Sequence, residues 1–197
     1  MGNRADLLAG AKRCLYEKGY ARTTARDIAG AAGTSLAAIG YHFGSTEALL
    51  NAALNEANEE WGEEIGRALG SPLTGDAAGA GPMARFEAIW QRVIDSFASH
   101  RTLWAASFEM LAQSERAPEV RERLADSLTR GRLGLAELFQ DIDPAADEHK
   151  AWAVGSFYQA LLSGVLVQWM VDPDHAPSAR DLTDALRLVA GTVDPPA

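Results

Sequence analysis

The stretch of this chain that decides its fold runs from Thr23 to Leu50 and reads T-T-A-R-D-I-A-G-A-A-G-T-S-L-A-A-I-G-Y-H-F-G-S-T-E-A-L-L. Its local signals predict two short helices, a tight turn between them, and the start of a third helix. Thr24 and Asp27 have the spacing of a capping box, in which hydroxyl and carboxylate satisfy the free amides of a helix start. Gly33 is the usual residue at the left-handed end of a helix. The first helix of the stretch is therefore expected between Thr24 and Gly33.

The second helix of the stretch is predicted over residues 36–43, with Ser35 as its N-cap. Ser45 caps the third helix, where Glu47 in the first turn interacts favourably with the helix dipole. Two helices joined by a tight glycine-containing turn form a helix-turn-helix, whose second helix can enter the major groove of DNA. Most helical hairpins are only packing units, so this pattern alone does not assign a function.

The amino-acid sequence of the stretch is more specific than its helix-turn-helix pattern. T-T-A-R-D-I-A, A-G-T-S and Y-H-F-G-S-T-E-A-L-L, within residues 19–54, closely resemble the DNA-binding domain of the TetR/AcrR family of bacterial repressors. The resemblance implies an all-α protein with a three-helix head at residues 1–50 and a six-helix effector-binding and dimerisation body at residues 51–197. It also implies a homodimer that binds inverted-repeat double-stranded DNA and that a small apolar or amphipathic ligand releases. A helical dimer that binds DNA constitutively, without an effector, is the alternative.

The resemblance also assigns residues to DNA binding. The predicted DNA-binding residues are Thr24, Arg26, Ser35, Leu36, Ala37, Ala38, Gly40, Tyr41, His42 and Thr46, of which the resemblance turns residues 36–38, 40 and 41 towards DNA. Thr24, Tyr41, His42 and Thr46 are the expected phosphate contacts, although the family usually has a lysine at the position of Thr46. The second helix has no Arg, Asn or Gln to grip a base edge. We therefore expect readout by thymine-methyl contacts from Leu36 and Ala37, by a hydrogen bond from Tyr41, and by DNA shape.

Charge is divided unevenly along the 197 residues, whose net charge is -9. Residues 1–50 hold six Lys/Arg and four Asp/Glu, a balance of +2, whereas the rest of the chain carries -11. Such an asymmetry suits a DNA-binding head on a body that DNA repels. Cys14 is the single cysteine, and residues 1–11 do not resemble a secretory signal. These features predict a reducing, cytoplasmic location.

The rest of the chain is also predicted to be helical. Apolar residues recur at helical spacing over residues 4–18, 45–69, 83–97, 103–111 and 120–139. Residues 70–81 are rich in glycine and proline and are predicted to be a loop. No run of period-two alternation predicts a strand.

The segment at residues 151–171 contains no charged side chain and is long enough to span a membrane. Several polar residues within the run and acidic residues at both flanks oppose that interpretation. We predict instead a helix that serves both the core and a dimer interface with the helix over residues 178–191. Gly155, Ala160 and Gly164 would allow a close approach of helices. The predicted dimer contacts are Leu162, Val165, Leu166, Trp169, Leu182, Leu186 and Val189.

The body is rich in aromatic residues. Aromatic residues at helical spacing more often pack a core than line a pocket, and the resemblance implies a pocket for some of them. The candidate pocket residues are Trp90, Phe97, Trp104, Phe108, Glu109, Trp152, Tyr158 and Gln159. An enzyme is the rival class, but the four histidines lack metal spacing and no nucleophile motif is present. We therefore expect no catalytic residue, no metal and no cofactor.

Overall fold

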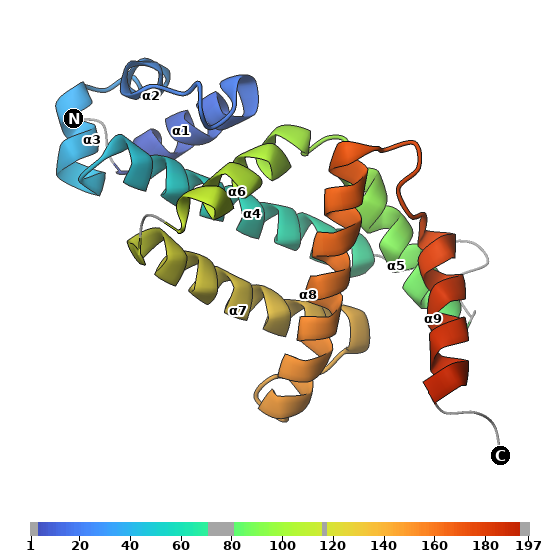
Figure 1. The fold of residues 1–197 in the computed structure, drawn as a ribbon. Helices are drawn as coiled ribbons and strands as arrows, with labels where there is room; N and C mark the ends of the chain where they lie inside the picture. Colours follow the sequence, from blue (N-terminus) through green and yellow to red (C-terminus); the bar gives the residue numbers. More distant parts are fainter. Residues whose placement is uncertain (1–3, 71–80, 116–117, 194–197) are drawn as a thin grey trace. The chain divides into compact units, whose positions relative to one another are not determined.

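The computed structural model describes residues 4–70, 81–115 and 118–193, which form nine α-helices and no strand (Figure 1). The helices are α1 (Arg4–Lys18), α2 (Ala25–Ala32), α3 (Leu36–Phe43), α4 (Thr46–Gly70), α5 (Pro82–Ser96), α6 (Arg101–Gln113), α7 (Pro118–Gln140), α8 (Glu148–Val171) and α9 (Ala179–Val193). The all-α prediction is confirmed. Most of the predicted loop at residues 70–81 lies outside the described residues.

The helix ends follow the caps expected from the sequence. Thr24 Oγ1 accepts from the backbone N–H of Asp27 at 3.3 Å, and Asp27 Oδ2 accepts from the backbone N–H of Thr24 at 2.9 Å. Gly33 ends α2 in the left-handed conformation, with φ of 63°. Ser45 Oγ accepts from the N–H of Ala48 at 3.0 Å and caps α4. Ser35 is the N-cap residue of α3, but its hydroxyl makes no capping hydrogen bond, which corrects one detail of the prediction.

The chain forms two compact units, residues 1–63 with 100–128 and residues 64–99 with 129–197. Within the first unit, α1 packs against α2 and α6, and α2 packs against α3 (Figure 1). The backbone of Gly10 lies so near α2 that an added Cβ would be 3.0 Å from Ala32 Cβ. The core of this unit contains Leu7, Ala11, Ile28, Ile39, Leu49, Leu54, Leu103 and Met110. The proposed head at residues 1–50 is therefore part of a larger compact unit that includes α6.

Helix α6 is joined to the turn between α1 and α2 by hydrogen bonds. Glu109 Oε2 accepts from the backbone N–H of Ala21 at 3.0 Å. The buried Tyr20 hydroxyl donates to Asn51 Oδ1 at 2.7 Å and lies 3.2 Å from Gln113 Oε1. Burial raises the pKa of Tyr20 to about 12, so this hydroxyl keeps its proton at neutral pH. Contacts across about ninety residues of sequence thus connect α6 with the head.

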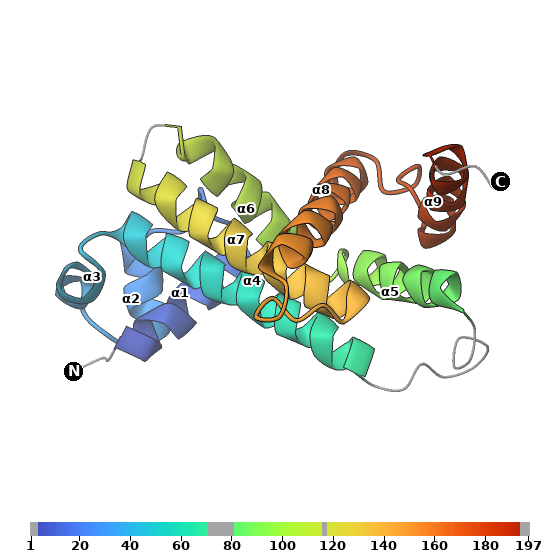
Figure 2. The ribbon, with the colours of Figure 1, turned by 90° about the horizontal axis from the view of Figure 1, so that it is seen from below.

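The second unit is built around aromatic side chains of α5, α7 and α8. The rings of Phe139 and Tyr158 stack with centroids 4.1 Å apart, and Trp90 lies 5.5 Å from Phe139. Helix α9 packs against α5 (Figure 2). Helices α7 and α8 cross closely, because a Cβ on Gly155 would lie 1.9 Å from the carbonyl oxygen of Arg132. Gly155 was expected to serve helix approach in general, and its close neighbour in the structure is α7 of the same chain.

Helix α8 has one buried face and one open apolar face. It is the one helix among the described residues with the length and composition of a membrane span. Ala151, Tyr158 and Val165 are buried within the unit. Phe157, Val167 and Val171 are exposed, and their spacing places them together on the opposite side. The helix is therefore a core helix that leaves an apolar stripe uncovered.

Candidate functional site

Helix α3, the second helix of the helix-turn-helix, has an exposed face without charged side chains. Ile39 is 3% exposed and anchors α3 in the core of the first unit. Leu36 is 49% exposed and Tyr41 is 86% exposed, although both are large apolar or aromatic side chains. Ala37 and Gly40 are exposed beside them. These four residues stand at i, i+1, i+4 and i+5, so they share one face of α3, opposite to its anchor.

The remaining predicted DNA-binding residues surround this face, and none of them is buried. Thr24, Arg26 and Ser35 are exposed, and Ala38, His42 and Thr46 are partly exposed. The rings of Tyr41 and His42 make an edge contact, with centroids 4.9 Å apart. The structure thus brings the N-terminus of α2, the whole exposed face of α3 and the N-terminus of α4 into one unit of the chain.

Thr24 is held in place by Asp27, its partner in the predicted capping box, and Asp27 in turn pairs with Lys18, which the sequence pattern did not predict. Asp27 Oδ1 pairs with Lys18 Nζ at 2.5 Å, and Asp27 Oδ2 accepts from the Thr24 hydroxyl at 2.7 Å. The hydrogen bond from Lys18, followed by those from Thr24, holds the pKa of the Asp27 carboxyl well below its usual range. The carboxylate therefore fixes the start of α2. It also pairs with Lys18, so Lys18 is less available to bind a DNA phosphate than an unpaired lysine would be.

The basic residues of the head are unequal in their availability. Lys12 pairs with Glu56 Oε1 at 2.6 Å and Glu60 Oε1 at 2.5 Å, so it joins α1 to α4. The guanidinium of Arg4 lies over the ring of Phe43, 4.9 Å from its centroid, and ties the start of α1 to the end of α3. Arg26 is exposed on α2, beside the capping box. Of these, Arg26 is best placed to add positive charge at the exposed surface.

The predicted dimer residues fall into two groups. Val165 and Leu166 are buried within their own unit, and Leu162, Trp169, Leu182 and Leu186 are partly buried. Trp169 packs edge-on against Phe97 of the same unit, with centroids 5.6 Å apart. Val189 is exposed, as are Leu188 on α9 and Val167 and Val171 on α8. The exposed apolar side chains of α8 and α9 thus include Val189 and, outside the predicted set, Leu188, Phe157, Val167 and Val171.

The predicted pocket residues are distributed over both units. Trp104, Phe108 and Glu109 belong to the first unit, where Glu109 is exposed and accepts a hydrogen bond from the backbone N–H of Ala21. Trp90 and Phe97 are fully buried and Tyr158 is nearly so, as core residues are. Gln159 is partly buried, with its amide oxygen 3.2 Å from a Cβ placed on Gly131. Trp152 is 44% exposed and lies under the guanidinium of Arg132.

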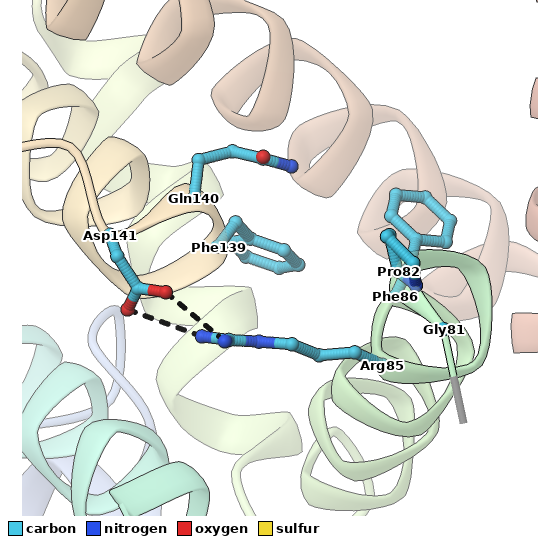
Figure 3. Close-up of a pocket in the computed structure, with 7 residues that line it drawn as sticks. All are labelled: Gly81, Pro82, Arg85, Phe86, Phe139, Gln140 and Asp141. Carbon is cyan, nitrogen blue, oxygen red and sulfur yellow. Dashed lines mark hydrogen bonds and ion pairs between the residues drawn. The ribbon is translucent and has the colours of Figure 1, made fainter. Parts of the chain in front are cut away.

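A pocket of about 310 Å³ lies beside this aromatic core, between the start of α5 and the end of α7. Its lining consists of Gly81, Pro82, Arg85, Phe86, Phe139, Gln140 and Asp141 (Figure 3). Figure 3 shows Arg85 reaching from α5 towards the carboxylate of Asp141, with the ring of Phe139 beside it. Arg85 Nη1 lies 3.1 Å from Asp141 Oδ2, and Arg85 Nη2 donates to Asp141 Oδ1 at 3.2 Å. The sequence analysis missed this pocket, although it named two aromatic neighbours of it, Trp90 and Tyr158.

The pocket is lined by two buried aromatic side chains and by two exposed charged side chains. Phe86 and Phe139 are buried, whereas Arg85 and Asp141 are exposed. Gln140 Nε2 donates to the Tyr158 hydroxyl at 2.6 Å, which connects the pocket to the stacked ring behind it. Asp141 has φ of 53°, a left-handed conformation that costs energy for a residue with a side chain. An ion pair this exposed contributes little stability, so its groups can exchange partners at small cost.

Comparisons with known proteins agree with this geometry. The family described as bacterial regulatory proteins, tetR family, matches residues 7–53, and the BetI-type transcriptional repressor C-terminal family matches residues 82–194. A search of curated proteins found no match for the chain.

Several solved structures share the fold. A TetR-family transcriptional regulator from Mesorhizobium loti is 17% identical, with a TM-score of 0.67 over 96% of this chain and 95% of that chain. The multidrug binding protein EbrR, solved with proflavin, is 21% identical, with a TM-score of 0.62 over 94% and 98%. Salmonella enterica GusR is 23% identical, with a TM-score of 0.59 over 96% and 93%. Identities this low show the fold alone, whereas the C-terminal family match covers more than half of the chain. The chain therefore belongs to the TetR family of DNA-binding transcriptional regulators.

Proposed function

We propose that this regulator is a repressor that binds an inverted-repeat operator as a homodimer and leaves it when a small molecule binds its body. The exposed face of α3 is the observation that carries the DNA-binding part. Leu36 and Tyr41 are large side chains left in solvent on a helix whose other face is anchored. Exposed large side chains on one face are typical of a binding surface.

Base readout is proposed to depend on shape and on apolar contacts. Helix α3 carries neither the Arg that pairs with guanine nor the Asn or Gln that pairs with adenine. Leu36 and Ala37 are proposed to contact thymine methyl groups, and Tyr41 to hydrogen-bond. Thr24, Tyr41, His42 and Thr46 are proposed to contact phosphates and set the register.

Dimerisation is proposed to use the open apolar surface of α8 and α9. Val171 is 82% exposed and Leu188 is 72% exposed, and each lies on a helix whose other face is already packed. A second copy would cover these side chains, as TetR-family regulators typically form dimers. Members of this family are soluble DNA-binding proteins, and one apolar helix does not indicate a membrane protein. We expect a cytoplasmic location, where DNA is present.

The effector is proposed to be an amphipathic aromatic molecule that binds the pocket between α5 and α7. Phe86 and Phe139 provide apolar walls, and Asp141 provides an anion whose pairing with Arg85 is exposed and weak. The net negative charge of the chain favours a cationic group on the ligand. Binding of proflavin by EbrR makes proflavin a suitable first probe.

The DNA-binding proposal is tested by selecting fragments of genomic DNA with the full-length protein. We expect one inverted-repeat sequence to be enriched, with affinity that falls steeply as salt rises. Enrichment of no sequence would refute the repressor proposal.

The ligand proposal is tested by titrating proflavin into the full-length protein and following tryptophan fluorescence, with operator affinity measured in parallel. We expect binding, and weaker operator binding when proflavin is present. Asp141→Asn should weaken proflavin binding, and Asp174→Asn, an exposed charge change outside the pocket lining, should not. Asn tolerates the left-handed backbone at position 141, so the fold is preserved. Binding that leaves operator affinity unchanged would favour the constitutive DNA-binding dimer.

A further inference from the structure

Gly40 lies in the middle of α3, where glycine is a poor choice for helix stability. Several other glycines of the head have internal reasons to be glycine, whereas Gly30 on α2, like Gly40, has none among the described residues. Gly33 and Gly44 have positive φ values of 63° and 79°, and a Cβ on Gly10 would press on Ala32. Gly40 has no such reason among the described residues, because its φ is not positive and no atom lies within 4 Å of an added Cβ. Gly40 is therefore unconstrained within the protein, as Gly30 and Gly62 are.

The position of Gly40 on α3 distinguishes it from the other unconstrained glycines. Gly40 is exposed in the face that also contains Leu36, Ala37 and Tyr41, one turn after Leu36 and Ala37. An α-helix with its side chains is about 10–12 Å across, and the major groove is about 12 Å wide. The depth to which such a helix enters the groove is therefore limited by the side chains on its leading face. Residues without long side chains at the centre of that face allow the backbone itself to approach the bases.

We propose that Gly40 is a specificity-determining residue: its missing side chain lets the backbone of α3 approach the base edges, and a thymine methyl group occupies the space where a Cβ would lie. A methyl group is the apolar feature that the major groove offers to an uncharged helix. This inference rests on the proposed role of α3 in reading the operator. It deepens that role by naming the base and the position that meets it.

The test compares Gly40→Ala with Gly62→Ala in the full-length protein. Gly62 is a matched control because it is an exposed helical glycine with no atom near an added Cβ. It lies sixteen residues after the start of α4, about 24 Å along the helix. Alanine is the better helix former, so both variants should unfold about 2–4 °C higher than the parent. Gly40→Ala should also bind the selected operator about tenfold more weakly or worse, whereas Gly62→Ala should bind it like the parent.

A second selection, from randomised operators, identifies the base. The parent should require thymine at one position of each half-site, and Gly40→Ala should lose that requirement while non-specific affinity stays within about twofold of the parent. Unchanged operator affinity and base preference in Gly40→Ala would overturn the inference. A lower unfolding temperature for Gly40→Ala would also overturn it, because it would reveal a reason for glycine inside the protein. If the parent itself enriches no sequence, the proposed function fails instead, so the two failures are distinguishable.

Discussion

The close crossing of α7 and α8 makes Gly155→Ala the most demanding test of the second unit. An added Cβ would lie 1.9 Å from the carbonyl oxygen of Arg132 and 2.6 Å from its carbonyl carbon. Both are backbone atoms, which cannot rotate away as the end of a side chain can. One helix must therefore move by more than 1 Å, and overpacking of this kind costs about 1–3 kcal/mol or more.

The net change in the free energy of unfolding of Gly155→Ala depends on two opposing contributions. Alanine stabilises a helix interior relative to glycine by about 1 kcal/mol, which offsets part of the steric cost. Because the clash is with backbone, we expect the upper end of the overpacking range and a net loss of about 2 kcal/mol. For a chain of this size such a loss lowers the unfolding midpoint by about 4–8 °C.

The assay is thermal unfolding followed by circular dichroism, at one fixed protomer concentration because a dimer makes the midpoint concentration-dependent. Gly134→Ala is the matched control, since Gly134 is exposed on α7 and an added Cβ there has no atom within 4 Å among the described residues. It should raise the midpoint by about 2–4 °C. A Gly155→Ala midpoint equal to or above that of the parent would show that α7 and α8 do not cross as described.

Three further predictions concern the head, the dimer surface and the cap of α2. Thr46→Lys should tighten binding to all DNA by a similar factor and steepen the salt dependence by roughly one contact per subunit, and an unchanged slope in a salt titration would contradict this. Val167→Glu should weaken dimerisation in sedimentation experiments and leave the protomer folded. Val165→Glu should instead unfold the second unit, because Val165 is buried. An unchanged mass for Val167→Glu would exclude this surface as the dimer interface. The pKa of Asp27 is lowered first by Lys18, so its ionised carboxylate stabilises the fold above about pH 4, and this stabilisation is lost as the pH falls below that value. The thermal midpoint of Asp27→Asn should therefore fall less in acid than that of the parent. Parallel pH profiles of the two proteins would contradict this.

The helix ends were predictable because their signals are local. Thr24 with Asp27 forms the predicted capping box, and Ser178 with Asp181 forms another at the start of α9. Each requires only residues three apart in sequence, so no knowledge of the fold is needed. The left-handed glycine at position 33 is likewise a local requirement.

The faces of α8 were not predictable in the same way. Residues 151–171 are apolar around the whole helix, so periodicity does not distinguish the side that meets the core from the side that meets a partner. Val165 was expected at a dimer surface and is in the core, and Val171 was not selected and is exposed. The partner of Glu109 was equally hidden, because Ala21 is 88 residues away in sequence and contributes only a backbone N–H.

The contacts between α6 and the head offer a physical route for the proposed response to a ligand. Glu109 accepts from the backbone N–H of Ala21, and the Tyr20 hydroxyl donates to Asn51 on α4 and contacts Gln113 on α6, so these bonds position the turn between α1 and α2. Ile28 and Ile39 are buried in the core of the same unit. A single such bond contributes about 0.5–1.5 kcal/mol. Allosteric switches of about 5–150-fold require a coupling of about 1–3 kcal/mol. In the proposed switch, an effector that moved α6 enough to break the Ala21–Glu109 bond and the Tyr20–Gln113 contact would therefore supply coupling in this range.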